Sequence, residues 1–216
     1  LPVGDDRLVV DVTPNRADLL GHKGIARELA WSYGVPFRLP ELPGASTEGL
    51  GSLARAEGQR ALVAGVTVGT YDAEGCPRFT AVVIRGVKVG PSPRWLAERL
   101  EAAGVRSINN VVDATNYVML ELNHPMHAYD LAQLCGPSVV ARRARAGETV
   151  VTLDGVTRTL TADMTVIADA ERVIGVAGVM GAENTEVSDQ TTDLLLECAC
   201  FEPARVRRTR RALGLS

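Results

Sequence analysis

Neutral hydrogen-bonding side chains are concentrated in residues 109–130, which read NNVVDATNYVMLELNHPMHAYD. Four asparagines, two histidines and two aspartates lie there among residues that suit an apolar core. Thr115 and Asn116 fall near the C-terminal half of a predicted helix, and a buried asparagine must satisfy both its amide and its carbonyl. These two side chains therefore either cap a neighbouring loop or line a binding site.

His127 follows Pro125, which favours extended backbone at His124 and turns the chain out of that helix. An imidazole in this position either projects into a cleft or packs as a structural histidine. His124 and His127 are three residues apart, a spacing that metal ligands use on a helix. Because Pro125 breaks the helix and no carboxylate or cysteine stands at a matching distance, we predict no metal site. A metal-dependent hydrolase stays an alternative.

Glu197 interrupts LLLECACF, a run that is otherwise apolar on both faces of a predicted strand. Carboxylates are rarely buried without a partner. An inward-facing Glu197 would need a cation, a hydrogen-bond donor or a ligand, whereas on the solvent face of an edge strand it would need none.

The glycine-rich segment GVAGVMGAE (175–183) contains neither G-x-G-x-x-G nor a G-K-[ST] ending, and no helix pattern follows it. It is therefore not a phosphate loop. Its glycines fit a close approach of the backbone to a ligand or a bulge. Five arginines between Arg205 and Arg211 form a basic helix that either contacts phosphates or is a solvated face.

Hydrophobic periodicity predicts the elements that carry these residues. Helices are expected from Asn15 or Asp18 to Tyr33, from Ser92 as N-cap to Gly104, and from Ser107 as N-cap to about Leu122. Strands are expected at 8–12, 78–90, 139–145, 150–153, 156–160, 165–170, 172–177 and 191–201, with hairpins at Asp154-Gly155 and near Ala170-Glu171. This order indicates an α+β fold with mostly antiparallel, sandwich-like sheets and flanking helices.

The character of the chain changes at residues 36–58, which are rich in Pro, Gly and Ser and lack a sustained apolar period. Such a stretch is typical of a linker or a surface crossing. We therefore divide the chain into a partial N-terminal α/β piece at 1–44, a linker at 45–69 and a larger part at 70–216.

Composition narrows the class of protein. The 216 residues carry a formal charge of −3, which argues against a uniformly cationic nucleic-acid binder but permits local basic faces. No apolar stretch of about 18 residues and no signal-peptide pattern is present, so we expect a cytoplasmic protein without membrane contact. Four cysteines without CxxC or metal-ligand spacing indicate reduced thiols. Both chain ends indicate a piece of something longer.

Five blocks of sequence carry a resemblance to a known family. In order they are DVTPNRADLLGHKGIARELA, INNVVDATNYVMLELNHPMHAYDL, VTLDGVTRTLT, GVAGVMGAENTEV and LLECACFEPARVRRTRRALGL. Together they resemble the β subunit of bacterial phenylalanyl-tRNA synthetase from about residue 7 to the end. The resemblance implies that 1–44 is the end of the subunit's first domain and that 70–216 is most of its editing module.

The resemblance also implies a function. The module would hydrolyse tyrosine wrongly attached to phenylalanine tRNA, while the α subunit of an α2β2 heterotetramer performs activation and transfer. ATP and Mg²⁺ would serve the complete synthetase, and no cofactor is expected in this segment. The alternative is a noncatalytic scaffold or tRNA-binding region. Buried polar groups are useful in an editing site. In other synthetases, a site that hydrogen-bonds a substrate hydroxyl rejects the analogue without that hydroxyl by about 10⁴-fold or more.

Site residues follow from the same resemblance. It implies that Glu197 bonds the tyrosine phenol, and that His127, Asn116 and Thr115 line the site around the ester and the terminal ribose. Ala177 and Gly178 would form a close backbone wall, and a positioned water would attack without a covalent nucleophile. The sequence departs from the family pattern at Asn123-His124-Pro125, where glutamine commonly precedes the proline, and at Ala182, where glycine is common. These changes bear on fine specificity.

Overall fold

The structure is a computed structural model that describes residues 8–39, 53–56 and 60–215. Contacts between Cα atoms divide the chain into two compact units. Unit 1 comprises Leu1–Ser46 and Val89–Met126, and unit 2 comprises Thr47–Lys88 and His127–Ser216. Each unit therefore combines segments that are distant in the sequence, and the predicted domain limits do not coincide with this division.

Unit 1 is helical. Its elements are the 3₁₀ helix η1 (Ala17–Leu20) and the helices α1 (His22–Tyr33), α2 (Arg94–Ala102) and α3 (Asn110–Leu122). Gly34 ends α1 in the left-handed conformation, with φ of 64°, as predicted for this glycine. Nδ1 of His22 lies 2.9 Å from the carbonyl oxygen of Leu120, so α1 and α3 are joined by a polar contact. The predicted strand at 8–12 is absent from the described residues.

Two predicted helix caps in unit 1 were wrong. Ser92 makes no capping bond to α2, and the residue that caps α3 is Asn109, not Ser107. Both serine hydroxyls instead donate to Oδ2 of Asp113, at 2.5 Å each. Asp113 is fully buried, and a buried carboxylate requires donors more strongly than a helix end that water can reach.

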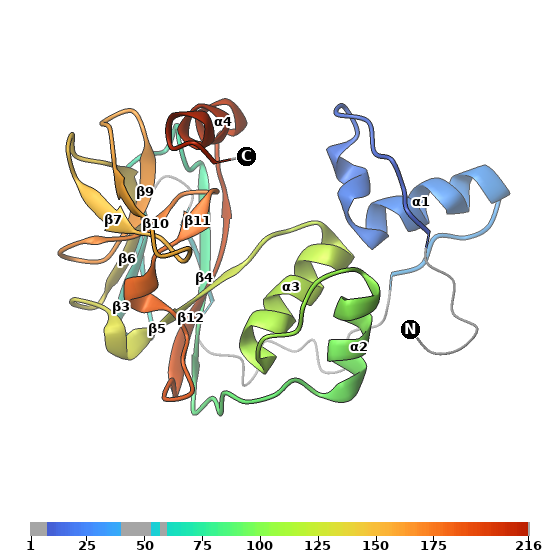
Figure 1. Cartoon of the computed structure of the whole chain (residues 1–216), viewed down its shortest axis with the longest axis horizontal. Coiled ribbons are helices and arrows are strands. Elements are labelled where there is room, and N and C mark those ends of the chain that lie inside the picture. Colours follow the sequence, from blue (N-terminus) through green and yellow to red (C-terminus); the bar gives the residue numbers. More distant parts are fainter. Residues whose placement is uncertain (1–7, 40–52, 57–59, 216) are drawn as a thin grey trace. The chain divides into compact units, whose positions relative to one another are not determined.

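Unit 2 contains a β-sandwich (Figure 1). One sheet has the order β1 (Leu53–Ala56), β4 (Arg78–Arg85), β12 (Asp193–Cys200), β5 (His127–Asp130). The other has the order β11 (Met180–Gly181), β10 (Val173–Val176), β9 (Thr165–Ala168), β6 (Ser138–Arg143), β3 (Val66–Thr70), β2 (Arg60–Val63). All neighbouring strands in these sheets are antiparallel except β3 and β6, which confirms the predicted α+β fold with mostly antiparallel sheets.

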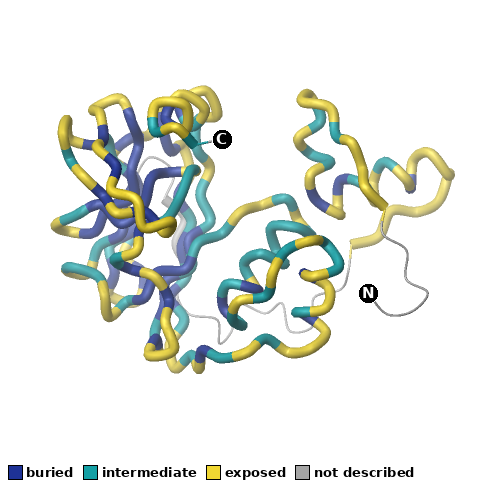
Figure 2. The backbone as a smooth tube through the Cα atoms, in the orientation of Figure 1, coloured by how far each residue is buried: buried dark blue, intermediate teal, exposed yellow. Residues whose placement is uncertain are grey.

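An apolar core lies between the two sheets of the sandwich, and a second buried cluster includes Val166 of β9 and Val173 of β10. Phe79, Val83 and Leu195 of one sheet belong to the same buried cluster as Val139 and Ile174 of the other. Figure 2 shows this concentration of buried residues in the sandwich, whereas the helices of unit 1 are mostly intermediate or exposed. The alternation of buried and less buried residues along β4 produces this packing, because alternate side chains face one side of a sheet.

A hairpin, two 3₁₀ helices and a last helix complete unit 2. β7 (Thr149–Val151) and β8 (Thr157–Thr159) form the hairpin predicted around Asp154-Gly155, with Gly155 at φ 73°. The 3₁₀ helices are η2 (Leu131–Gln133) and η3 (Glu183–Thr185). The last helix, α4 (Pro203–Ala212), is capped by Glu202 with Pro203 in its first turn, as the Glu-Pro pair predicts.

The predicted linker at 45–69 was wrong where the structure describes it, because β1, β2 and most of β3 fall within this range. β2 and β3 are paired around Ala64-Gly65, both of which have positive φ. Such a two-residue turn matches the twist of a hairpin. The neighbouring residues are rich in Pro and Gly, so the apolar periodicity of this sequence range did not indicate the two short strands.

Candidate functional site

His127 and Glu197 are directly opposite each other in the register of β5 and β12. β12 lies between β4 and β5, so Glu197 belongs to an interior strand of its sheet. Its residue exposure is only 6%. The alternative of a solvent-facing glutamate on an edge strand is therefore wrong, and the carboxylate needs a partner inside the protein.

That partner is Tyr129, a residue that the sequence analysis missed. Its hydroxyl donates to Oε2 of Glu197 at 2.5 Å, and its ring centroid lies 4.6 Å from that of His127 in an edge-to-face arrangement. Because side chains alternate along a strand, His127 and Tyr129 project from the same face of β5. The spacing H-A-Y in a segment after Pro125 was the signal that could have identified it.

Burial shifts the titration of all three side chains. It raises the pKa of Glu197 to about 7, against the opposing effect of the Tyr129 hydrogen bond. It lowers the pKa of His127 to about 4, so the imidazole is neutral near pH 7. Burial and the neighbouring Glu197 raise the pKa of Tyr129 well above its ordinary value. The cluster therefore contains two neutral rings and one carboxyl group that titrates near neutrality.

Nε2 of His127 is buried and has no hydrogen-bond partner among the described residues. A buried polar nitrogen without a partner is unfavourable, and its presence identifies a place where a bound group would be stabilised. Two neighbouring strands thus carry a ring nitrogen that lacks a hydrogen-bond partner, on His127, and a carboxyl group, on Glu197.

Two glycines of the opposite sheet lie against this cluster. A Cβ on Gly181 would lie 2.4 Å from Cε1 and 2.7 Å from Nε2 of His127, so only glycine fits beside the imidazole. A Cβ on Gly175 would lie 3.7 Å from the Tyr129 hydroxyl, an ordinary contact. Gly175 and Gly181 are cross-strand partners in β10 and β11, so the cluster draws on both sheets.

Ala177 and Gly178 follow β10. Ala177 is part of the sandwich core. Gly178 has φ of 67°, and a Cβ there would lie 3.0 Å from side-chain atoms of Phe201 and Val206. The contacts of Gly178 are therefore with the start of α4 and the residue after β12, and the role of the two residues as a wall of a binding site stays a prediction.

Thr115 and Asn116 belong to α3 in unit 1, whereas the other four predicted site residues belong to unit 2. Both are partly buried. The Thr115 hydroxyl donates to the carbonyl oxygen of Val112 in its own helix at 2.7 Å, a common bond for threonine in a helix. Their roles at an ester stay predictions.

A separate cavity of about 450 Å³ lies elsewhere in unit 2. The residues that line it are Thr149, Val150, Val151, Thr157, Arg172, Val173, Glu183 and Asn184. Neither His127 nor Glu197 lines this cavity. Its wall is formed by the β7–β8 hairpin, the start of β10 and η3.

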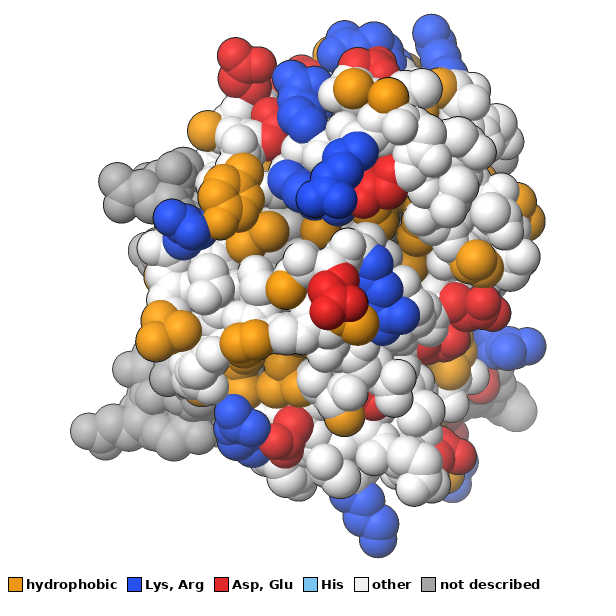
Figure 3. Space-filling model, turned by 90° about the vertical axis from the view of Figure 1, so that its left-hand side faces the viewer, with side chains coloured by type: hydrophobic (Ala, Val, Ile, Leu, Met, Phe, Trp, Pro, Cys, Tyr) orange, Lys and Arg blue, Asp and Glu red, His pale blue; other side chains and the backbone are white. Residues whose placement is uncertain are grey.

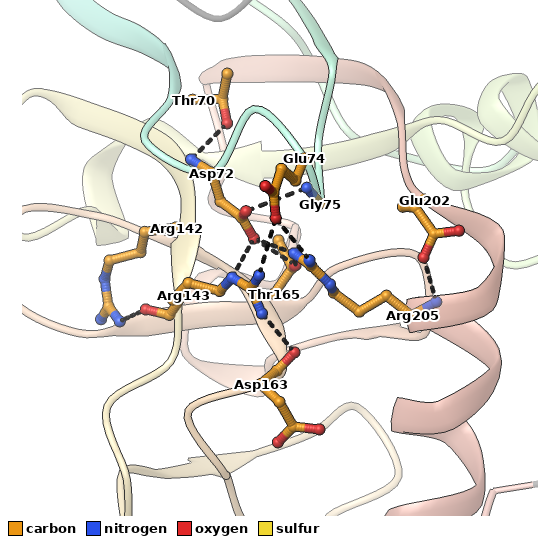
Figure 4. A network of polar contacts seen from close by, with 10 residues as sticks. All are labelled: Thr70, Asp72, Glu74, Gly75, Arg142, Arg143, Asp163, Thr165, Glu202 and Arg205. Carbon is orange, nitrogen blue, oxygen red and sulfur yellow. Dashed lines mark hydrogen bonds and ion pairs between the residues drawn. The ribbon is translucent and has the colours of Figure 1, made fainter.

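Asp72 is the centre of a second buried polar cluster, drawn in Figure 4. Its Oδ2 accepts hydrogen bonds from Thr165 at 2.8 Å and from Nη1 of Arg205 at 2.7 Å, and lies 3.1 Å from Nε of Arg143. Burial disfavours the charge on Asp72, but the bonds from Thr165 and Arg205 hold the pKa of this carboxyl below its ordinary value. The cluster attaches α4 to β9 and β6.

Within the described ranges, no three His, Cys, Asp or Glu side chains gather in a way that could hold a metal ion. None of the helices formed by these residues has the length and apolar character that crossing a lipid bilayer requires. The cysteines Cys76, Cys135, Cys198 and Cys200 are free thiols.

Comparisons with known proteins agree on one family. The model of the B3/4 domain matches residues 75–216. The chain is 52% identical over its whole length to the phenylalanine–tRNA ligase beta subunit of Anaeromyxobacter dehalogenans (strain 2CP-C), and covers 26% of it. It is 48% identical to that of Carboxydothermus hydrogenoformans, again over the whole chain, and covers 25% of that relative. The chain thus spans about a quarter of the length of these relatives.

A solved structure shows the same fold. The crystal structure of an N-terminal fragment of the phenylalanyl-tRNA synthetase beta subunit from Pyrococcus horikoshii matches with a TM-score of 0.50 at 16% identity. The match covers 93% of this chain and 59% of that one.

Proposed function

Because this chain belongs to the phenylalanine–tRNA ligase β-subunit family, we propose that it hydrolyses tyrosine wrongly attached to phenylalanine tRNA. The chain includes the B3/4 domain of that subunit. Activation of phenylalanine with ATP and Mg²⁺ belongs, in this proposal, to the α subunit of the complete synthetase, and tRNA is the shared substrate.

The hydrogen bond between Tyr129 and Glu197 is the observation that carries the proposal. A buried carboxyl group here already accepts a hydrogen bond from a phenolic hydroxyl at 2.5 Å. A carboxylate has about four lone-pair sites, so a second phenol can be accepted beside the first. Tyrosine would supply that donor, whereas phenylalanine would bring no hydrogen-bond donor to the carboxylate.

Hydrolysis in this proposal needs a water and no covalent intermediate. The water oxygen attacks the ester carbonyl carbon, the bond from that carbon to the ribose oxygen breaks, and the ribose oxygen takes a proton. The products are free tyrosine and intact tRNA. Among the residues that the structure describes, Nε2 of His127 has no hydrogen-bond partner, and the pKa of the imidazole is about 4. The ring is therefore neutral at pH 7 and would orient the water by accepting a hydrogen bond from it.

Four other residues have proposed positioning roles. Thr115 and Asn116 would orient the ester and the terminal ribose, since neutral groups fix geometry without adding charge. Ala177 and Gly178 would form a wall along the backbone.

The test is a Glu197→Gln variant of the complete synthetase, assayed with phenylalanine tRNA that carries tyrosine. The amide keeps the size of the side chain but loses the carboxylate, so clearance of tyrosine should fall about 10²-fold or more. Charging with phenylalanine should not change. Glu171→Gln is the matched control, because Glu171 is exposed in the turn between β9 and β10. Unchanged clearance by Glu197→Gln would reject the proposal.

A noncatalytic scaffold or tRNA-binding region is the second candidate. Tyr129 already gives Glu197 a hydrogen-bond partner within the protein, and the described cavity is lined by other residues. If the pair is only structural, Glu197→Gln and Tyr129→Phe should lower stability alike and leave the clearance of tyrosine unchanged. The editing proposal instead expects the loss of clearance in Glu197→Gln when the protein is still folded.

A further inference from the structure

The exposed side of α4 carries four guanidinium groups that have no ion-pair partner among the described residues. They belong to Arg207, Arg208, Arg210 and Arg211, which we call the arginine face. Within the described part of the chain, no carboxylate lies within 4.0 Å of any of them. Figure 3 shows one face of the molecule, on which Lys and Arg side chains lie near Asp and Glu side chains over most of the surface.

This concentration of charge is unfavourable for the helix itself. Arg207 is three and four residues before Arg210 and Arg211, and like charges at these spacings repel each other on a helix surface. The negative end of the helix dipole relieves the repulsion only in the last turn, where Arg210 and Arg211 lie. Arg207 and Arg208 receive little of this relief.

The carboxylates near α4 are already engaged. Asp72 and Glu74 are paired with Arg143 and Arg205 in the cluster of Figure 4. Glu202 accepts hydrogen bonds from the amides of Ala204 and Arg205 as the helix cap.

Asp163 accepts a bond from Thr161 and attracts Arg208 only through the longer-range field. The arginine face therefore retains positive charge that the neighbouring residues do not neutralise.

The helix that carries this charge is held firmly. Arg205 points inward from α4, is only 9% exposed, and is bonded to Asp72 and Thr165. Thr209, one turn later, is also buried. Since polar bonds anchor the inward side, the backbone that carries the outward arginines is held in place, and binding need not order the helix itself.

We propose that the arginine face of α4 binds consecutive phosphates of an RNA backbone. Guanidinium groups match phosphate oxygens in bidentate geometry, and four of them on one side of a short helix favour a polyanion over a single anion. A membrane surface is a poor match, because α4 exposes only Pro203, Ala204 and Ala212 besides its arginines and so has no apolar face to insert.

The inference rests on the proposed function only for the source of the RNA, which is the tRNA that the synthetase charges. Binding to the phosphate backbone carries no sequence information, so the arginine face would hold and orient the tRNA whichever amino acid it carries.

The experiment measures the affinity of the complete synthetase for uncharged phenylalanine tRNA over a range of salt concentrations. The double variant Arg207→Gln/Arg211→Gln should bind about ten-fold more weakly at low salt. The slope of log affinity against log salt is negative, and its magnitude should decrease by about 1.5, since each lost phosphate contact removes about 0.7–0.9. Arg207→Lys/Arg211→Lys keeps the charge and should retain most of the slope.

The matched control is Arg85→Gln/Arg94→Gln, which removes two exposed arginines that are paired with Asp193 and Glu98. It should leave affinity and slope unchanged. The proposal is overturned if Arg207→Gln/Arg211→Gln behaves like this control, or if the lysine variant loses as much as the glutamine variant. Hydrolysis of mischarged tRNA at saturating concentration should be unaffected, which separates this result from a failure of the proposed editing function.

Discussion

The hydroxyl of Tyr129 donates a 2.5 Å hydrogen bond to Glu197, a carboxyl group that pairs across β5 and β12 with His127. Burial acts on the two titrating neighbours in opposite directions, because it disfavours charge on both an acid and a base. It raises the pKa of Glu197 to about 7 and lowers that of His127 to about 4. The pH dependence of stability should therefore report on this pair.

We predict that the two residues nearly cancel in the wild-type protein. Between its ordinary pKa of 4.5 and about 7, Glu197 keeps a proton only in the folded state, so its contribution is full below pH 4.5 and is lost as the pH rises. Between about 4 and 6.5, His127 is protonated only in the unfolded state, so its contribution is gained as the pH rises. Each change amounts to about 3 kcal/mol, from about 1.4 kcal/mol per pKa unit.

Urea denaturation of single variants between pH 4 and 8 separates the two contributions. Relative to wild type, Glu197→Gln should gain stability as the pH rises from 4.5 to about 7, the range over which Glu197 titrates. His127→Asn should lose stability relative to wild type as the pH rises from about 4 to 6.5, the range over which His127 titrates. The comparison is made with wild type because carboxylates such as Asp72 and Asp113 titrate alike in all three proteins. Parallel curves for the three proteins would show that the pair does not titrate as described.

Gly181 should be intolerant of a side chain. A Cβ there would lie 2.4 Å from the imidazole of His127, so Gly181→Ala must displace the ring and should cost about 1–3 kcal/mol of stability. Gly175→Ala is the matched control, because its Cβ would have only ordinary contacts at 3.7 Å. Thermal unfolding measures the first effect, and deacylation by the complete synthetase measures the loss of a positioned His127. Equal behaviour of the two variants would contradict the packing of His127 on Gly181.

The sequence was informative where one residue type contradicted its surroundings. Glu197 in an apolar run indicated that an inward-facing carboxylate would need a cation, a donor or a ligand, and the structure supplies a donor, the Tyr129 hydroxyl. The identity of that donor was not predictable, because it depends on the register of β5 against β12, and strands separated by many residues have no local signal for register. The contact of Gly181 with His127 joins two sheets and was hidden for the same reason.

Local patterns failed where a distant group competed for the same atoms. Ser92 and Ser107 have the right type and position for helix caps, but both bind Asp113, whose burial arises from the packing of α2 and α3. The strands within the predicted linker were missed because β2 and β3 are short and gain their stability from pairing in the sheet. Caps and short strands are therefore decided by tertiary contacts more than by propensity.

Asp113 should be essential to the stability of unit 1. It accepts hydrogen bonds from Ser92, Ser107 and the amide of Ile108. Burial by itself would raise the pKa of Asp113, but the two serine bonds outweigh this effect and hold the pKa below its ordinary value of 3.8. We expect Asp113→Ala to cost about 3 kcal/mol or more, since three donors lose their acceptor, and Ser107→Ala about 1 kcal/mol.

Because the pKa of Asp113 is depressed in the folded state, its contribution is present above pH 3.8 and is lost as the pH falls. Urea denaturation at pH 7 and near pH 3 should show the cost of Asp113→Ala shrinking at the lower pH. A cost that is small at pH 7, or that is the same at both pH values, would contradict a charged and fully bonded Asp113.

Asp72 and Glu74 offer a matched comparison within one cluster, because Arg143 and Arg205 lie near both carboxylates. Asp72 is buried and 2.7 Å from Arg205, whereas the side chain of Glu74 is 86% exposed and 3.6 Å away. Removing the charge of Asp72 leaves the buried Arg205 with the exposed Glu74, 3.6 Å away, as its remaining ion-pair partner, so Asp72→Asn should cost about 3–5 kcal/mol. Glu74→Gln removes an exposed pair and should cost at most about 1 kcal/mol. Urea denaturation gives both values, and similar costs for the two variants would show that burial does not decide the strength of these pairs.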